Sequence, residues 1–281
     1  MRWQDLRQSS NVEDRRGISG RGIAIGGGGL GVIIIALAVL LCGGDPSSLF
    51  QSGGPIDSQQ VQSPAANSAA PEQPDENSRF ARAIMGSLED GWKQILPQQT
   101  RVRYQDPKLV LYTGQVRSAC GLGDAAMGPF YCPGDMNLYL DFAFFDELRR
   151  EFKAPGDFAQ AYVIAHEFGH HIQNLMGTMD RLQASNAGNR GSVALELQAD
   201  CYAGIWANYA AKQGRLDASD PEEAIRAASS VGDDMIQRRT QGYVVPDSFT
   251  HGSSQQRMQW FKQGYRSGDI NACDTFSAAQ R

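Results

Sequence analysis

The chain has 281 residues, with 26 Lys and Arg against 31 Asp and Glu, so its formal net charge is −5. This mild acidity excludes the basic face that a nucleic-acid partner requires. The apolar fraction of 41% is ordinary for a globular protein and supplies enough material for a core. Histidine is scarce, yet three of the four histidines lie within residues 166–171.

The first predicted element is a transmembrane helix over residues 23–42, which contain no charged side chain. About 20 helical residues cross the roughly 30 Å hydrocarbon core of a bilayer. Arginines precede this stretch, and residues 22–78 contain no Lys or Arg. The positive-inside rule then predicts a single-pass protein of the bacterial inner (cell) membrane, with a cytoplasmic N-terminus and a periplasmic or extracellular domain.

Two other interpretations of this stretch, a cleaved signal peptide and a lipid anchor on Cys42, fit less well. The head before it is long for a signal peptide, and bulky Leu41 stands where lipidation expects a small residue. Gly27 and Gly31 have the GxxxG spacing of a weak homodimer contact, although a generic small-residue face explains them as simply.

The remaining chain divides by composition. We expect a basic cytoplasmic head at 1–22, a flexible Pro/Ser/Gln linker at 43–76 and a folded domain at 77–281. Within the domain, apolar periodicity and capping residues predict, in chain order, a helix at 77–97, strands at 108–116, near 130 and at 137–142, and helices at 144–152, 157–177, 192–213, 220–241 and 254–266. Strands followed by helices indicate an α+β fold. We also expect the strand at 137–142 to bind a substrate backbone as an added strand.

Four cysteines follow the predicted span. Export favours disulfides among Cys120, Cys132, Cys201 and Cys273 over the alternative of reduced thiols. Four cysteines allow three pairings. In one of them Cys120–Cys132 would close a short Gly-rich loop and Cys201–Cys273 would tie the last segment to a helix, but the sequence leaves the connectivity open.

The strongest motif is His166-Glu167-Phe168-Gly169-His170, or HExxH, inside a predicted helix. Positions i and i+4 lie one turn apart on one helix face, so both imidazoles can bind one Zn²⁺. Glu167 lies on the flank, where a carboxylate can take a proton from an attacking water. His171 is turned about 100° from His170 and is not expected to be a ligand.

A catalytic zinc normally takes three protein ligands. Glu196 and Asp200 share one face of the next long helix, 26 residues after His170. We expect Glu196 to be the third ligand and Asp200 to accept a hydrogen bond from a ligand histidine, with the reverse assignment as the alternative. His251 and Arg257 lie near the start of the last long helix, where either can stabilise an oxyanion. His251 alternatively fills the open zinc position at rest, or is simply a surface histidine.

These segments resemble the bacterial predicted neutral zinc metallopeptidase family (YpfJ-like), membrane-anchored proteins with a zincin-type domain. The resemblance extends over nearly the whole chain, including FYCPGDMNLYLD, AHEFGHHIQ, ELQADCYAGIWA and HGSSQQR. The active-site motifs are also similar to the HtpX-like and CAAX prenyl protease group, whose E-x-x-A-D glutamate is the third zinc ligand and matches Glu196. The group's T-H-P element has Gly252 in place of proline here, which changes the loop beside His251.

The sequence therefore predicts a membrane-anchored zinc metallopeptidase that acts on a peptide or protein substrate with one Zn²⁺ per chain. In this mechanism Glu167 is the general base, and His251 and Arg257 assist. Two alternatives stay open: a membrane-tethered binding or assembly factor with a structural or vestigial zinc, and a zinc amidase acting on cell-wall peptides.

Overall fold

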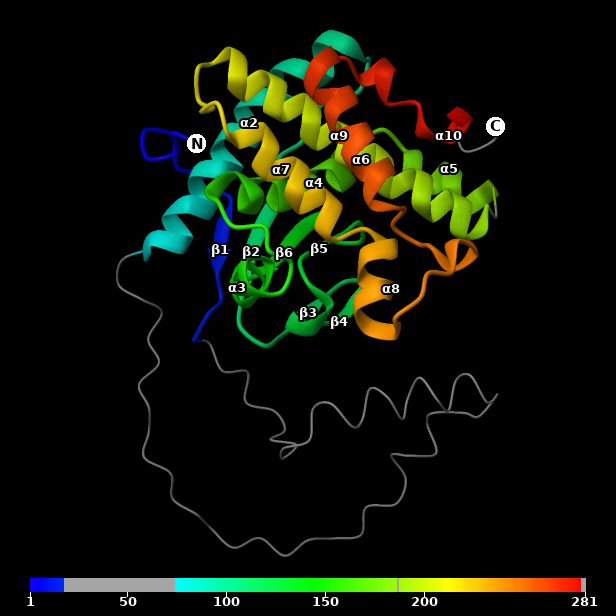
Figure 1. Ribbon diagram of the computed structural model, residues 1–281. Helices are drawn as coiled ribbons and strands as arrows, with labels where there is room; N and C mark the ends of the chain where they lie inside the picture. The colour runs from blue at the N-terminus through cyan, green and yellow to red at the C-terminus, as the bar shows by residue number, and fades with distance from the viewer. Residues whose placement is uncertain (18–73, 186, 279–281) are drawn as a thin grey trace, which may run out of the picture. The chain divides into compact units, whose positions relative to one another are not determined.

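The computed structural model describes residues 1–17, 74–185 and 187–278 of the chain. The fold is mixed α+β, as predicted, and Figure 1 shows most of the helices packed over a small sheet. Its four strands run in the order β1-β2-β6-β5, with β5 antiparallel to β6 and the other neighbours parallel. The strands are β1 (Val12–Asp14), β2 (Lys108–Tyr112), β5 (Phe130–Cys132) and β6 (Asn137–Asp141), while β3 (Gln115–Ser118) and β4 (Gly121–Asp124) form a separate hairpin.

The helices cover one continuous apolar core. Phe158, Phe168, Tyr202 and Trp206 are among its fully buried side chains. The helices are α2 (Glu76–Gln99), α3 (Ala143–Arg150), α4 (Asp157–Leu175), α5 (Thr178–Ser185), α6 (Gly188–Lys212), α7 (Asp220–Ser230), α8 (Asp233–Gln241), α9 (Ser254–Ser267) and α10 (Thr275–Ala278), with short 3₁₀ turns η2 (Ala125–Met127), η3 (Pro246–Ser248) and η4 (Ile270–Cys273).

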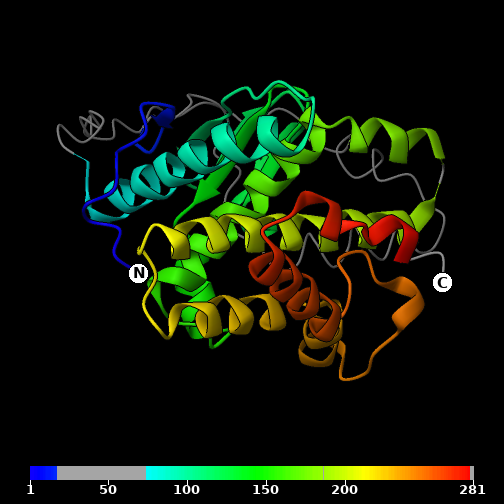
Figure 2. The same cartoon turned by 90° about the horizontal axis from the view of Figure 1, so that it is seen from above.

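The N-terminal segment, Met1–Gly17, belongs to this same unit, although a separate head was expected. The strand β1 pairs with β2, and the Trp3 ring packs edge-on against Phe80 of α2. In both views the N-terminal segment runs beside α2 (Figures 1 and 2). Buried Glu89 of α2 accepts a hydrogen bond from Ser9 at 2.5 Å. From the same segment, Arg7 forms ion pairs with Glu89 and Asp90 of α2, and Arg16 forms one with Asp75.

The predicted membrane localisation is contradicted. Within residues 1–17, 74–185 and 187–278 no helix is long and apolar enough to cross a bilayer. Residues 1–17 and 74–278 also form one unit, so a single membrane cannot have the head on one side and the domain on the other. The predicted span, its Gly27 and Gly31 pair, and residues 43–73 of the predicted linker lie outside the described residues.

Two predicted elements are divided in the structure. The strand at 108–116 breaks at Gly114, whose φ of +76° allows the turn into β3. The helix at 220–241 breaks at Gly232, where a Cβ would overlap the backbone of Ser254. That close approach brings the start of α9 against the α7–α8 junction.

The expected disulfides are confirmed, and the structure selects one of the three possible pairings. Cys120–Cys132 ties the β3–β4 hairpin to the end of β5, and Cys201–Cys273 ties α6 to the C-terminal turn η4.

Candidate metal centre

The centre forms where α4 crosses α6. Gly169 makes the crossing close, because a Cβ there would lie 2.9 Å from the Ala199 carbonyl oxygen. Glycine in the HExxH sequence therefore brings the two helix backbones together. As a result, side chains from one helix reach those of the other across a short gap.

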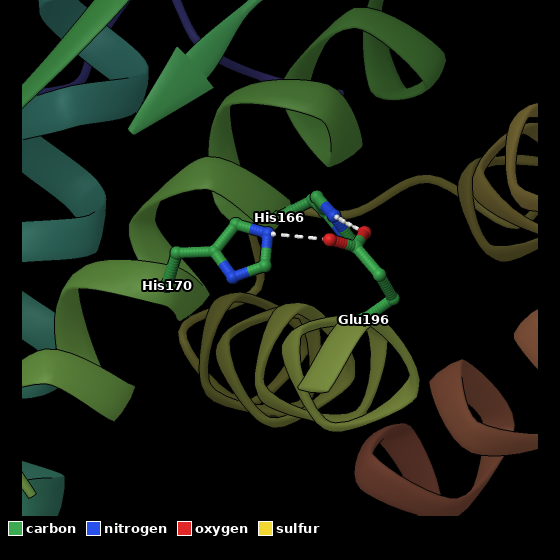
Figure 3. Close-up of side chains that lie close together, drawn as sticks. All are labelled: His166, His170 and Glu196. Atoms are coloured by element: carbon green, nitrogen blue, oxygen red, sulfur yellow. Dashed lines mark hydrogen bonds and ion pairs between the residues drawn. The ribbon is translucent and has the colours of Figure 1, made fainter. Parts of the chain in front are cut away.

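His166, His170 and Glu196 come together at this crossing, with one ligand atom from each lying within 4.8 Å of the others. Glu196 extends from α6 toward the two imidazoles of α4, and its carboxylate faces both (Figure 3). Its carboxylate oxygens lie 3.1 Å from His166 Nε2 and 3.5 Å from His170 Nε2. Both imidazoles thus present Nε2 to the same point as the carboxylate.

The second nitrogen of His166 faces Asp200. The carboxylate of Asp200 is fully buried and lies 2.9 Å from His166 Nδ1. It also accepts hydrogen bonds from Arg257 at 2.8 and 3.0 Å and from the hydroxyl of Tyr162. Burial alone would lower the pKa of His166, but Asp200 and Glu196 outweigh it and raise this pKa to about 10.

Gln173 forms a hydrogen bond with the second ring nitrogen of His170. The amide nitrogen of buried Gln173 donates to the Leu195 carbonyl at 2.7 Å and to Gln198 Oε1 at 3.2 Å. Its amide oxygen is therefore the atom that faces His170 Nδ1, at 2.8 Å. An acceptor at Nδ1 requires a proton there, which leaves the Nε2 lone pair for a metal.

Tyr162, Gln173 and Gln198 were not expected from the sequence. Helical spacing offers a signal for two of them, because Tyr162 precedes His166 by one turn and Gln173 follows His170 by three residues. The partner of each depends on α6 and α9, which no local pattern reveals.

Glu167 flanks the cluster and lies in a pocket of about 570 Å³ that also contains His166, His170 and Glu196. Burial raises the pKa of Glu167 to about 7, partly offset by the neighbouring His166 and by a hydrogen bond from the backbone N–H of Tyr131. Tyr131 belongs to β5, so the edge strand of the sheet borders the pocket.

The two remaining predicted site residues differ in their surroundings. Arg257 is buried, and its guanidinium is bonded to Asp200, to Tyr162 at 3.2 Å and to the Val231 carbonyl at 3.2 Å. His251 lines the same pocket but is half exposed, and its Nδ1 lies 3.2 Å from Asp233. Of the two, His251 is the side chain with access to a bound molecule.

His171 lies outside the ligand cluster, and its contacts explain its place. One ring nitrogen is 3.1 Å from the Tyr131 hydroxyl, and the other is 2.7 Å from the Gln105 carbonyl. The Gln105 carbonyl requires the ring proton on Nε2, so Nδ1 of the neutral ring accepts from the Tyr131 hydroxyl, which itself accepts from Asn174. This histidine therefore holds the edge strand β5 against α4.

The expected substrate strand was assigned incorrectly. The strand β6 pairs with β2 on one side and β5 on the other, so its backbone hydrogen bonds are used. Within the described sheet the free edge beside the pocket belongs to β5.

The donor set fits zinc. Two imidazole nitrogens and one carboxylate oxygen are typical ligands of a catalytic zinc with an open position. The outer nitrogens are held by Asp200 and Gln173, as metal-binding histidines usually are. Burial opposes ionisation of Glu196, yet the two histidines keep its pKa well below the usual range, so the carboxylate is charged.

The sequence and the geometry of this centre are those of a zinc-peptidase family. The chain belongs to the family described as "Putative neutral zinc metallopeptidase", which it matches over residues 1–276. It is 46% identical to "Uncharacterized protein YpfJ" of Escherichia coli strain K12, over 98% of this chain and 99% of the relative. It is 43% identical to "Uncharacterized protein Rv2575" of Mycobacterium tuberculosis strain H37Rv and to "Uncharacterized protein Mb2605" of Mycobacterium bovis, over 85% of each chain. No solved structure matches the chain.

Proposed function

We propose that this protein is a zincin-like metallopeptidase that hydrolyses peptide bonds at the His166, His170 and Glu196 centre. The observation that carries the proposal is the position of Glu167. Its carboxylate shares the pocket with all three ligands without belonging to the ligand cluster. A purely structural zinc site has no use for such a carboxylate.

The chemistry divides between the metal and the chain. Zinc, when bound, lowers the pKa of a water molecule and polarises a carbonyl group. Glu167 takes the proton of the attacking water and delivers it to the leaving amine. His251 stabilises the oxyanion that develops on the scissile carbonyl. Arg257 acts indirectly, because its hydrogen bonds hold Asp200 against His166.

Substrate binding uses the outer edge of β5. An extended peptide can add to an edge strand through backbone hydrogen bonds. Here such a peptide would bond to carbonyl groups of the strand, because the Tyr131 N–H is bonded to Glu167. Such a peptide would pass the pocket that contains Glu167 and the ligands. The position of Tyr131, which contacts both Glu167 and His171, fixes this edge relative to the helix that carries the motif.

The test compares the full chain with its Glu167→Gln variant. The full chain is required because β1, which belongs to the N-terminal segment, pairs in the sheet. Each sample is loaded with zinc, its bound zinc is quantified, and it is incubated with a diverse peptide library. Cleavage by the parent alone, with equal zinc in both samples, is the expected result.

Three other outcomes would contradict the proposal. Equal zinc with no cleavage by either protein would favour a binding or assembly factor. Cleavage of cell-wall muropeptides but of no library peptide would favour an amidase. A parent that binds no zinc would remove the basis of all three interpretations.

A further inference from the structure

Exposed apolar side chains gather on two segments. The most exposed large hydrophobic residues in the described part of the chain are Leu122, Met127, Met235, Tyr243 and Val245. The first two lie on β4 and η2, and the other three on α8 and the loop that follows it. Scattered exposed hydrophobic residues are ordinary, but their concentration on two segments indicates an interaction surface.

Both segments border the candidate metal centre. Met127, which is 73% exposed, lines the same pocket as Glu167 and His166. From the other segment, Ile236 lines this pocket, next in sequence to Met235, which is 46% exposed. Of the exposed residues, Met127 thus lines the pocket itself, and Met235 is the sequence neighbour of a residue that lines it.

We call the exposed residues Leu122, Met127, Met235, Tyr243 and Val245 the apolar rim. The pocket walls beside the candidate metal ligands are also apolar. Phe130, Phe144 and Phe152 line the pocket from the β5 and α3 region, and Val231 and Ile236 line it from the α7–α8 region. All five are partly buried, and Arg239 covers one face of the Phe152 ring. Apolar side chains thus line the pocket together with the candidate metal ligands.

The charged residues that line the pocket affect which ligands it can bind. Its lining includes the carboxylates of Glu147, Glu167 and Glu196. Among the described residues that line it, the only guanidinium is that of Arg257, which is buried in its ion pair with Asp200. Such a lining offers apolar contact and carboxylates, although exposed Arg239 of α8 lies beside it, 4.2 Å from the centre of the Phe152 ring.

The rim on the β4 side is anchored. The Cys120–Cys132 disulfide joins the turn of the β3–β4 hairpin to the last residue of β5. The stacked rings of Phe130 and Tyr139, 4.7 Å apart, support the same strand. A rim held to the edge strand keeps its apolar side chains in a fixed place relative to a peptide on that edge.

We infer that this cleft binds extended polypeptide segments rich in bulky apolar side chains, which Met127 and the exposed apolar residues of the α8 region contact on either side of the metal centre. The inference rests on the proposed peptidase function, and it names the substrate class of that site. Continuity with the catalytic pocket and the edge strand β5 identify the occupant as a substrate polypeptide.

The experiment measures peptide binding to the zinc-loaded full chain carrying Glu167→Gln, which binds without turnover. Three fluorescein-labelled peptides of equal length are compared: one rich in Phe and Leu, one with Ser at those positions, and one with Glu there. The apolar peptide is expected to bind at least about tenfold more tightly than the other two, because it alone removes the apolar rim from water.

Variants locate the contact. Met127→Ser combined with Met235→Ser should weaken binding of the apolar peptide about tenfold, since both side chains are exposed and their loss leaves the fold intact. Lys212→Ser is the matched control, because Lys212 is exposed and lies about 24 Å along α6 from Glu196. It should bind the apolar peptide as the parent does.

The outcomes separate this inference from the function on which it rests. Equal binding of the three peptides, or unchanged binding by the double methionine variant, overturns the inference. So does a parent that binds no peptide but forms dimers that the double variant abolishes, because the rim would then be an interface between copies. Selective binding of the apolar peptide that the parent cannot cleave would support the cleft while contradicting the peptidase.

Discussion

Replacing Asp200 with leucine tests the buried polar network behind the candidate metal centre. The change removes a fully buried carboxylate that accepts two hydrogen bonds from Arg257 and lies 2.9 Å from His166. Arg257, itself only 4% exposed, is left without its counter-charge. Breaking a buried pair from one side costs about 3–5 kcal/mol. The free energy of unfolding of the metal-free, disulfide-intact full chain should fall by about this amount in urea titrations.

The same variant should also bind zinc about 10–100-fold more weakly, because His166 loses the acceptor that orients its ring. Competition with a chromophoric chelator measures this affinity. A companion variant with Asp200→Leu and Arg257→Met separates the two effects. Replacing both charges with apolar side chains should restore most of the stability, whereas zinc affinity should stay low. Parent-like stability of the single variant, or full recovery of zinc affinity in the double, would refute the reasoning.

Three further predictions concern other parts of the domain. Gly264→Ala should destabilise the chain by about 3 kcal/mol in urea titrations, because a Cβ there would overlap the Cys201 carbonyl oxygen across the α6–α9 contact; a parent-like midpoint would contradict this packing. Removing the Cys201–Cys273 disulfide by Cys273→Ser should lower the free energy of unfolding by about 4 kcal/mol, because the disulfide joins residues 72 positions apart. The same urea titrations measure this change. Asp233 raises the pKa of His251 through its hydrogen bond, so their mutual stabilisation is present below the ordinary histidine pKa and is lost as the pH rises through the raised value. Asp233→Asn should therefore shift the NMR titration of His251 to lower pH, and an unchanged titration would show that the bond is absent in solution.

Sequence reasoning selected the three candidate ligands because the pattern that marks them is local. His166 and His170 are one turn apart on one helix, and Glu196 stands on the next long helix within an E-x-x-A-D run. The cluster of these three side chains agrees with that expectation. The helix of each ligand was also predicted, since α4 and α6 carry clear apolar periodicity and end near Gly177 and Gly214.

The contacts that the sequence did not reveal are all non-local. Gln173 is oriented by the Leu195 carbonyl of another helix, and Arg257 reaches Asp200 from α9. The strand β1 has three residues, too few for periodicity to be visible, and its partner β2 begins at Lys108. The charges of the N-terminal segment resembled the cytoplasmic flank of a membrane helix because sequence alone does not reveal their internal partners.

The pairing of β1 with β2 makes the intervening chain a closed loop. Asp14 is aligned with Leu111, and Arg16 forms an ion pair with Asp75 at 2.8 Å, so the two ends of residues 18–73 leave the fold at neighbouring points. A protease that cuts once between them would produce two fragments without separating them, because the N-terminal segment remains paired in the sheet and packed on α2. The N-terminal segment is thus held to the domain by strand pairing and ring packing in addition to the covalent chain.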